Sequence, residues 1–188
     1  GYTDDNCIDF NRALNTTVKR TVEIKEKRRD VSGVSSGFEA IDKITGGFQN
    51  SDLIIIAARP SMGKTALAIN MAFNSAKSFL SAKENQSIAV FSLEMSTEQI
   101  VTRIISTNTG IESNKIRNGT YLTSEDISLI TKTSIDISDL PIFIDDSASP
   151  TISAIRTRSR RMKRQHNLGM IVIDYLQLIR GVENHANK

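Results

Sequence analysis

The pattern of apolar and polar positions changes near residue 35. Before that point, apolar residues recur at every fourth position between charged ones, at Phe10, Leu14, Val18 and Val22. This spacing predicts an amphipathic helix over about residues 9–29, whose single apolar stripe needs a neighbour to cover it. The small-residue stretch VSGVSSG then predicts a turn or hinge. We therefore expect residues 1–31 to form a helix and hinge attached to a compact domain.

Beyond this hinge, short apolar runs alternate with stretches of helical periodicity. The runs are rich in β-branched residues, as in strands buried on both faces, and they cover residues 53–58, 87–93, 141–145 and 170–179. Helical periodicity covers most of the intervals, at about residues 63–80, 96–106, 122–137 and 151–167. This alternation predicts an α/β fold, in which helices flank both faces of a parallel sheet.

Local signals refine three of the predicted helices. Ser96 is a predicted N-cap, and Glu98 or Gln99 completes its capping box, depending on the register. Thr123 or Ser124 caps the next helix. The last helix is predicted to bury a stripe formed by Ile152, Ile155 and Met162.

Composition narrows the class of protein. Apolar residues make up 39% of the chain and charged residues 24%, which is ordinary for a soluble domain. The apolar runs are too short to span a bilayer. No basic segment followed by an apolar stretch opens the sequence, so we do not expect a secretory signal. The single cysteine, Cys7, excludes an internal disulfide and is typical of a reducing compartment. We expect a cytoplasmic protein without a membrane partner.

Charge is concentrated in one stretch. Residues 151–173 contain no acidic residue and carry a charge of +6, against a net +3 for the whole chain. We interpret the stretch as a solvated helix face or a contact between subunits. A surface for nucleic acid or another anionic partner is the alternative, because like charges this dense repel one another.

The sequence ARPSMGKT at residues 58–65 fits the phosphate-loop pattern G-x-x-x-x-G-K-S/T except at Ala58. Such a loop lies between a strand and a helix, and its backbone N–H groups surround phosphate oxygens. Ala58 ends the strand before the loop closes, so it needs only an allowed backbone conformation. Lys64 would reach the β- and γ-phosphates and Thr65 would bind Mg²⁺. The predicted nucleotide-binding residues are Ser61, Met62, Gly63, Lys64, Thr65 and Ala66.

Two carboxylates follow predicted strands. Asp174 comes directly after the apolar run MIVI, which is the form of a Walker B acid that holds Mg²⁺ through water. Glu94 ends the run AVFSL in the same way and is the candidate general base for the attack of water on ATP. With Lys64 they make up a predicted catalytic site for ATP hydrolysis.

Three strings together carry a resemblance to a known family: ARPSMGKT, SLEM and VIDYLQL. From about Ser32 to Gly181 the chain resembles the RecA-like motor domain of the DnaB family of bacterial replicative DNA helicases. Alanine is common at the first phosphate-loop position of that family. The chain departs from the family at NSDL (50–53), where a glycine usually precedes the acid. Asn50 tolerates a left-handed turn, so we expect little consequence.

The resemblance implies a mechanism and partners. It implies ATP and Mg²⁺ as cofactors, Lys64 and Thr65 as their ligands, Glu94 as the base, and Asp174 in the metal shell. Arg103 and Arg117 also match family positions, with no role assigned. It implies 5′-to-3′ DNA unwinding by a homohexamer in which the N-terminal helix packs on the neighbouring subunit, with primase and a helicase loader as further partners.

The resemblance also implies what lies outside these 188 residues. Residues 32–181 correspond to the N-proximal part of the ATPase domain, and residues 182–188 form a polar tail. The later strands, the γ-phosphate-sensing glutamine, the DNA-binding loops and the arginine finger have no counterpart here. Such a finger contributes roughly 10³–10⁵ in rate in related NTPases. We therefore expect weak or no activity from this chain alone.

Two alternatives stay open from the sequence. One is another RecA-like ATPase of the recombinase or clock type, against which SLEM and DYLQL argue. The other is a non-catalytic module that binds a nucleotide or a partner without turnover.

Overall fold

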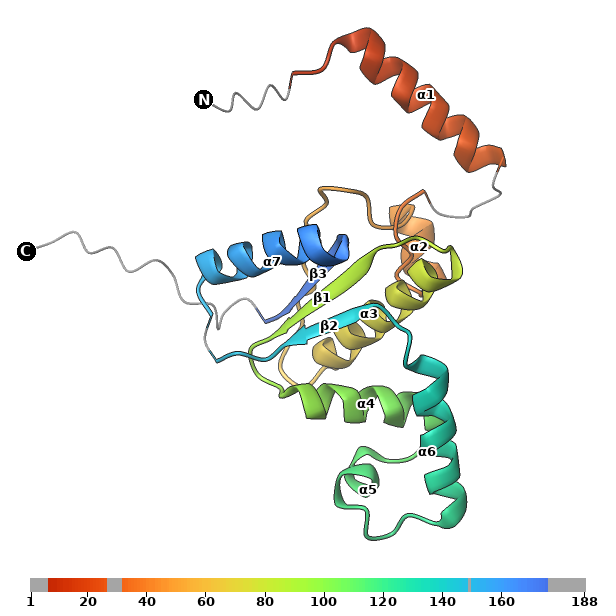
Figure 1. The fold of residues 1–188 in the computed structure, drawn as a ribbon, viewed down its shortest axis with the longest axis vertical. Helices are drawn as coiled ribbons and strands as arrows, with labels where there is room; N and C mark the ends of the chain where they lie inside the picture. The colour runs from red at the N-terminus through yellow and green to blue at the C-terminus, as the bar shows by residue number, and fades with distance from the viewer. Residues whose placement is uncertain (1–6, 27–31, 149, 176–188) are drawn as a thin grey trace, which may run out of the picture.

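The computed structural model describes residues 7–26, 32–148 and 150–175 (Figure 1). Its elements in chain order are α1 (Phe10–Glu26), α2 (Glu39–Thr45), α3 (Lys64–Ser81), β1 (Ser87–Ser92), α4 (Thr97–Thr109), α5 (Ser113–Asn118), α6 (Ser124–Ile137), β2 (Ile142–Asp145), α7 (Ile152–His166) and β3 (Leu168–Asp174). Strands and helices alternate from α3 onward, as the hydrophobic pattern predicts.

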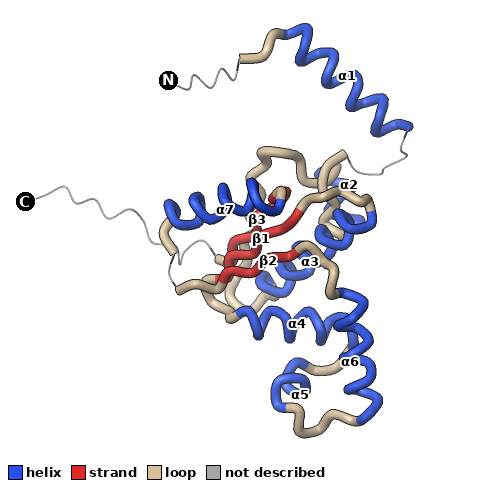
Figure 2. The backbone as a smooth tube through the Cα atoms, in the orientation of Figure 1, coloured by secondary structure: helices blue, strands red, loops and turns tan. Residues whose placement is uncertain are grey.

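The strands form a parallel sheet in the order β2-β1-β3 (Figure 2). β1 is therefore the central strand, with Ile88 opposite Ile142 on one side and Met170 on the other. The helix α3 covers one face of the sheet and α7 covers the other, which confirms the predicted α/β arrangement.

The core is built around β1, of which every residue is buried. Because successive side chains of a strand point to opposite faces, β1 contributes to two apolar clusters. Ile88 and Val90 pack with Phe79 and its neighbours on α3, while Ala89 and Phe91 pack with Ile155 of α7. The continuous apolar run in the sequence is thus explained by burial on both faces.

The predicted helix caps are confirmed. Ser96 caps α4 in a capping box with Gln99 rather than Glu98, and Thr123 rather than Ser124 caps α6 with Asp126 as its partner. In both boxes the cap hydroxyl accepts from the backbone N–H three residues on, and that residue's side chain accepts from the cap N–H.

The predicted strand at residues 53–58 is wrong. This segment has no strand assignment, and Leu53 and Ile55 are 84% and 68% exposed. It forms one wall of an open groove of about 770 Å³ whose other wall includes β3. An apolar run becomes a buried strand only when a neighbouring strand takes up its backbone hydrogen bonds and helices cover its faces. The segment has neither among the described residues.

Smaller differences concern element ends and one stripe. The short helices α2 and α5 are not predicted, and β3 begins at Leu168 rather than at residue 170. Residues 176–179 of that predicted strand lie outside the described residues. In α7, Ile155 is buried and Met162 packs against it, but Ile152 is exposed. Ile152 lies in the first turn of α7 and is not part of the apolar cluster between α7 and the sheet.

The N-terminal helix α1 is confirmed, and its apolar stripe is uncovered. The stripe residues are all exposed, with Phe10 at 80%: Phe10, Leu14, Val18 and Val22. A link to the rest of the molecule is made by Arg20, whose Nη2 donates to Gln49 Oε1 at 2.6 Å. Residues 27–31, where the predicted helix ends and the predicted hinge VSGVSSG (31–37) begins, lie outside the described residues; within the hinge, Val34 forms an isolated antiparallel bridge with Phe48. No helix in the described part of the chain is long and apolar enough to cross a membrane.

Candidate nucleotide-binding site

The carboxyl ends of the strands and the N-termini of α3 and α4 lie on one side of the molecule (Figure 1). Ligands bind at this edge in open α/β sheets. All of the predicted site residues, from Ser61 to Asp174, lie on this edge or on the loop that leads into α3.

The phosphate loop enters α3 through residues with left-handed backbone conformations. Ser61 has a φ of 66° and Gly63, the N-cap of α3, a φ of 83°. No side chain caps this helix, so its first-turn N–H groups face outward without a capping partner. A Cβ built at Gly63 would meet no atom within 4 Å, so the glycine is required by its backbone angle rather than by space. An uncapped helix N-terminus of this kind favours an anion.

Ala58 is not strained. The non-glycine residues with positive φ in the described ranges are Ser51, Ser61, Lys83 and Asn167. Alanine at the first phosphate-loop position therefore has an ordinary conformation, as expected.

The left-handed residue before Asp52 is Ser51, with a φ of 68°, and not Asn50. Gln49 and Asp52 close a turn, in which the Asp52 N–H donates to the Gln49 carbonyl at 3.1 Å. Ser51 is the third residue of this turn, the position that takes a positive φ in type II turns.

Lys64 and Asp174 line the same groove. Asp174 is the last residue of β3 and is only 6% exposed. The Lys64 Nζ lies 4.3 Å from the centroid of the Tyr175 ring, directly after this acid. The structure therefore brings the phosphate-loop lysine to the end of the strand that carries the predicted Walker B acid.

Glu94 and Thr65 line a second, neighbouring pocket of about 1000 Å³. The two family-matching arginines, Arg103 and Arg117, line it as well. Because Lys64 and Thr65 are consecutive on α3, the start of this helix separates the two hollows. The predicted site residues are thus divided between two adjoining hollows.

The loop that carries Glu94 is held through its backbone. The Leu93 N–H donates to the Asp174 carbonyl at 2.8 Å, and the Met95 N–H donates to Ser92 Oγ at 3.1 Å. The Ser96 N–H donates to Gln99 Oε1 at 2.9 Å, and the Thr97 N–H donates to Asp146 Oδ2 at 2.8 Å. The Glu94 residue itself is exposed. A fixed backbone thus presents an accessible carboxylate.

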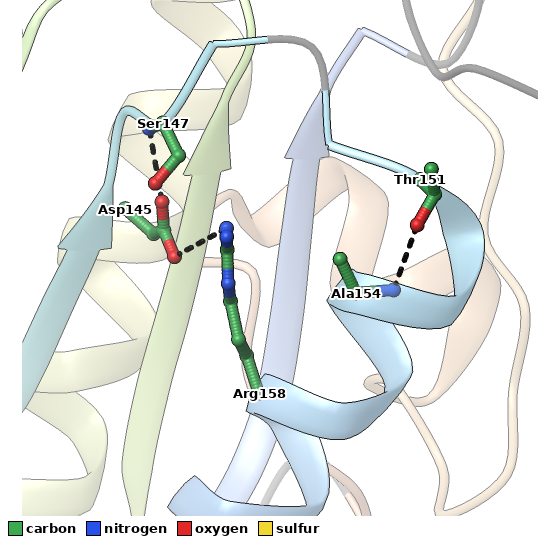
Figure 3. Close-up of polar contacts among 5 residues, drawn as sticks. All are labelled: Asp145, Ser147, Thr151, Ala154 and Arg158. Carbon is green, nitrogen blue, oxygen red and sulfur yellow. Dashed lines mark hydrogen bonds and ion pairs between the residues drawn. The ribbon is translucent and has the colours of Figure 1, made fainter.

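Sequence reasoning missed the acidic pair at the end of β2, in which Asp145 is the last residue of the strand and Asp146 follows it. Asp145 Oδ2 accepts from Arg158 Nη1 at 3.1 Å and its Oδ1 accepts from the Ser147 N–H at 2.9 Å (Figure 3). Burial acts to raise the pKa of Asp145, but the Ser147 hydrogen bonds and the Arg158 charge outweigh it and hold the pKa below its ordinary value. For Asp146, the hydrogen bond from the Thr97 backbone is the main cause of a lowered pKa. The string DD at the end of a predicted strand was the available signal.

The basic helix α7 is mostly solvent-facing. Thr151 caps it by accepting from the Ala154 N–H at 3.0 Å (Figure 3). Arg158 is half-buried in its ion pair with Asp145, whereas the other cations are exposed: Arg156, Arg160, Arg161, Lys163 and Arg164. This exposure agrees with a solvated face, and it leaves an anionic partner untested.

No three His, Cys, Asp or Glu side chains converge as a metal cage in the described ranges. Mg²⁺ bound together with a nucleotide does not need such a cage, because phosphate oxygens and water supply most of its ligands. A threonine hydroxyl and a carboxylate at the strand end are oxygen donors of the kind that Mg²⁺ prefers, so Thr65 and Asp174 fit this ion chemically.

The fold is that of RecA-like ATPase domains. A solved ATPase domain that is 30% identical superposes with a TM-score of 0.82 over 97% of this chain and 62% of its own. A solved DnaB-like replicative helicase, described with its interactions with primase, is 31% identical with a TM-score of 0.76, over 99% of this chain and 43% of its own. The model of the DnaB-like helicase C terminal domain family matches residues 33–188, and the chain belongs to this family.

Curated relatives agree with this assignment. The replicative DNA helicase DnaB of Rickettsia bellii is 48% identical over 163 residues, which are 84% of this chain and 32% of the relative. The protein of the same name from Geobacillus stearothermophilus is 47% identical over 152 residues, which are 81% of this chain and 32% of the relative. The chain therefore spans about a third of the length of these relatives.

Proposed function

We propose that this chain is the nucleotide-binding part of a replicative DNA helicase, a motor that couples ATP hydrolysis to 5′-to-3′ unwinding as a hexameric ring. The main support is one juxtaposition: the uncapped start of α3 with Lys64 lies between Asp174 on one side and the Glu94 loop on the other. Residues 32–181 would form the motor core in this proposal, and residues 1–31 the linker.

The nucleotide phosphates would bind to the backbone N–H groups between Ser61 and Ala66 and to the Lys64 ammonium. Lys64 now lies over the Tyr175 ring, a contact that contributes about 0.5–1 kcal/mol at exposed sites. A hydrogen bond to a charged group contributes about 1.5–3 kcal/mol. A phosphate therefore outcompetes the ring for this lysine.

Hydrolysis would use the remaining site residues. Thr65 and, through water, Asp174 would hold Mg²⁺, which supplies charge neutralisation on the phosphates. Glu94 would accept a proton from the attacking water, a role that its exposed position permits.

The proposed partners follow from the family. DNA would be the substrate, and a primase and a helicase loader would be further partners. The uncovered stripe of α1 would supply the contact between subunits of the ring, because it is the kind of apolar face that a neighbouring chain covers.

Binding of ATP with Mg²⁺, measured by isothermal titration calorimetry, tests the nucleotide site in this chain. Lys64→Ala removes one charge-assisted contact to phosphate, so we expect affinity to fall about 10- to 150-fold, the equivalent of about 1.5–3 kcal/mol. Lys77→Ala on the same helix is the control, because Lys77 lies over the Phe73 ring and away from the loop. Equal affinities of both variants would contradict the proposed site.

A non-catalytic binding module is the second candidate, and the exposure of most of residues 53–63 favours it. Steady-state ATP turnover and duplex unwinding by the complete protein that carries this sequence separate the candidates. We expect turnover that is lost in Glu94→Ala. Nucleotide binding without turnover in the wild-type protein would support the module, and turnover without unwinding would favour a recombinase- or clock-type ATPase.

A further inference from the structure

The backbone N–H groups of the loop from Ser92 to Thr97 donate hydrogen bonds to acceptors from different parts of the chain. Ser92, Gln99 and the Asp174 carbonyl belong to β1, α4 and the neighbouring strand β3. The remaining acceptor is the Asp146 carboxylate, which lies 49 residues from Thr97 in the sequence. It ties the Glu94 loop to the end of β2.

We propose that Asp146 is a positioning residue for Glu94: its carboxylate holds the Thr97 N–H and thereby fixes the loop that presents the base. This inference rests on the proposed function, because it assigns Asp146 to the hydrolysis step for which Glu94 is the base. In this role Asp146 would contact neither the nucleotide nor the water and would act only through the loop.

The position of Thr97 explains why a carboxylate fits there. Thr97 is the first residue of α4, so its N–H is one of the unsatisfied donors at the positive end of the helix dipole. Ser96 accepts from the Gln99 N–H, and Asp146 accepts from the Thr97 N–H, one of the donors that the capping box does not satisfy. Both acceptors hold the start of α4, whose first residue lies three positions after Glu94.

The neighbouring acid sets the direction of Asp146. Asp145 is turned toward α7, where Arg158 and the Ser147 N–H hold both of its oxygens (Figure 3). Successive side chains at a strand end point to opposite faces. Because α7 covers one face of the sheet and α4 packs with α3 on the other, fixing Asp145 toward α7 directs Asp146 toward α4.

The consequence for hydrolysis differs from that for binding. The phosphate loop and Lys64 make none of these contacts, so release of Thr97 should leave nucleotide affinity unchanged. Glu94 would lose its fixed distance to the attacking water. Misplacement of a catalytic group by about 1 Å can reduce the rate by about 10²-fold.

The test is ATP turnover by the complete protein with Asp146 substituted. For Asp146→Ala we expect kcat to fall about 10- to 100-fold, with KM for ATP and the unfolding midpoint close to wild type. Asp146→Asn keeps an oxygen acceptor and should restore most of kcat. Asp139→Ala, a change at an exposed acid just before β2, is the matched control and should behave as wild type.

A double-mutant cycle separates positioning from a general structural role. If Asp146 acts through Glu94, Asp146→Ala should reduce the residual rate of a Glu94→Ala protein no further. Wild-type kcat in Asp146→Ala, or an equal further loss in the Glu94→Ala background, would overturn this inference alone. A wild-type protein without turnover would instead overturn the proposed function and this inference with it.

Discussion

Two segments of the chain, 53–58 and 87–93, are similarly rich in apolar residues, but they differ in burial. The second contains β1, which has a strand partner on each edge and a helix on each face, and Ile88 is fully buried. The first has no ladder partner in the part of the chain that the structure describes, and most of its residues are exposed. Hydrophobicity alone therefore marks a segment as able to be buried. The hydrogen-bonding neighbours at its edges decide whether it is.

The same contrast continues into the loops that follow. The loop after β1 is held through several backbone N–H donors. Residues 59–63 are all exposed, and within them the Met62 N–H donates to the Arg59 carbonyl at 3.3 Å. We infer that the Glu94 side of the site is formed in advance, while the phosphate loop is ordered by the anion that it binds.

The largest expected effect separates the two runs by stability. Ile88→Ala should lower the free energy of unfolding by about 2–5 kcal/mol, because it leaves a cavity in the core. Ile55→Ala should change it by less than about 0.5 kcal/mol, because Ile55 is exposed. Urea unfolding followed by circular dichroism measures both.

The milder pair Ile88→Val and Ile55→Val keeps the comparison measurable if Ile88→Ala does not fold. Ile88→Val should still lower the free energy of unfolding by about 0.5–1.5 kcal/mol. Equal losses at the two positions would show that residues 53–58 are a buried strand after all, as the sequence predicts.

A medium effect sharpens the comparison at the loop after β1. Ser96→Ala and Thr123→Ala each remove the hydroxyl of a capping box and should each lower the free energy of unfolding by about 1 kcal/mol. Only Ser96 adjoins the Glu94 loop, so only its variant should also slow ATP turnover by the complete protein. A rate unaffected by Ser96→Ala would contradict a preformed Glu94 loop.

The elements that the sequence predicts correctly are those whose signals are local. The capping box at Ser96, the cap at Thr123, the periodicity of α3 and the buried apolar run of β1 each depend on residues within a few positions of one another. The placements of Lys64, Glu94 and Asp174 on one edge follow from the parallel topology.

The features that the sequence does not predict depend on distant partners. Exposure of residues 53–58 depends on whether a strand lies beside them, and the bond between Asp146 and Thr97 joins residues 49 apart. The short helices α2 and α5 have too few turns for a periodic signal. Ile152 has the correct spacing for the core, but it is the first residue of α7 and is exposed.

The smallest expected effect concerns the pH dependence of folding stability through Asp145. The pKa of Asp145 is lowered from its ordinary value of 3.8 by Ser147 and Arg158 acting against burial, so the ionised form stabilises the folded chain. This contribution is fully present above pH 3.8 and is lost as the pH falls through the lower folded-state pKa. Asp145→Asn should therefore reduce stability at pH 7 by under about 1 kcal/mol, as for other partly exposed ion pairs, and the difference from wild type should shrink below pH 3.8.

Urea unfolding at a series of pH values measures this difference in stability between Asp145→Asn and wild type, with Asp139→Asn as the control. A difference that stays constant down to pH 2 would mean that the ion pair with Arg158 does not fix the end of β2. Asp145 would then not direct Asp146 toward the loop after β1.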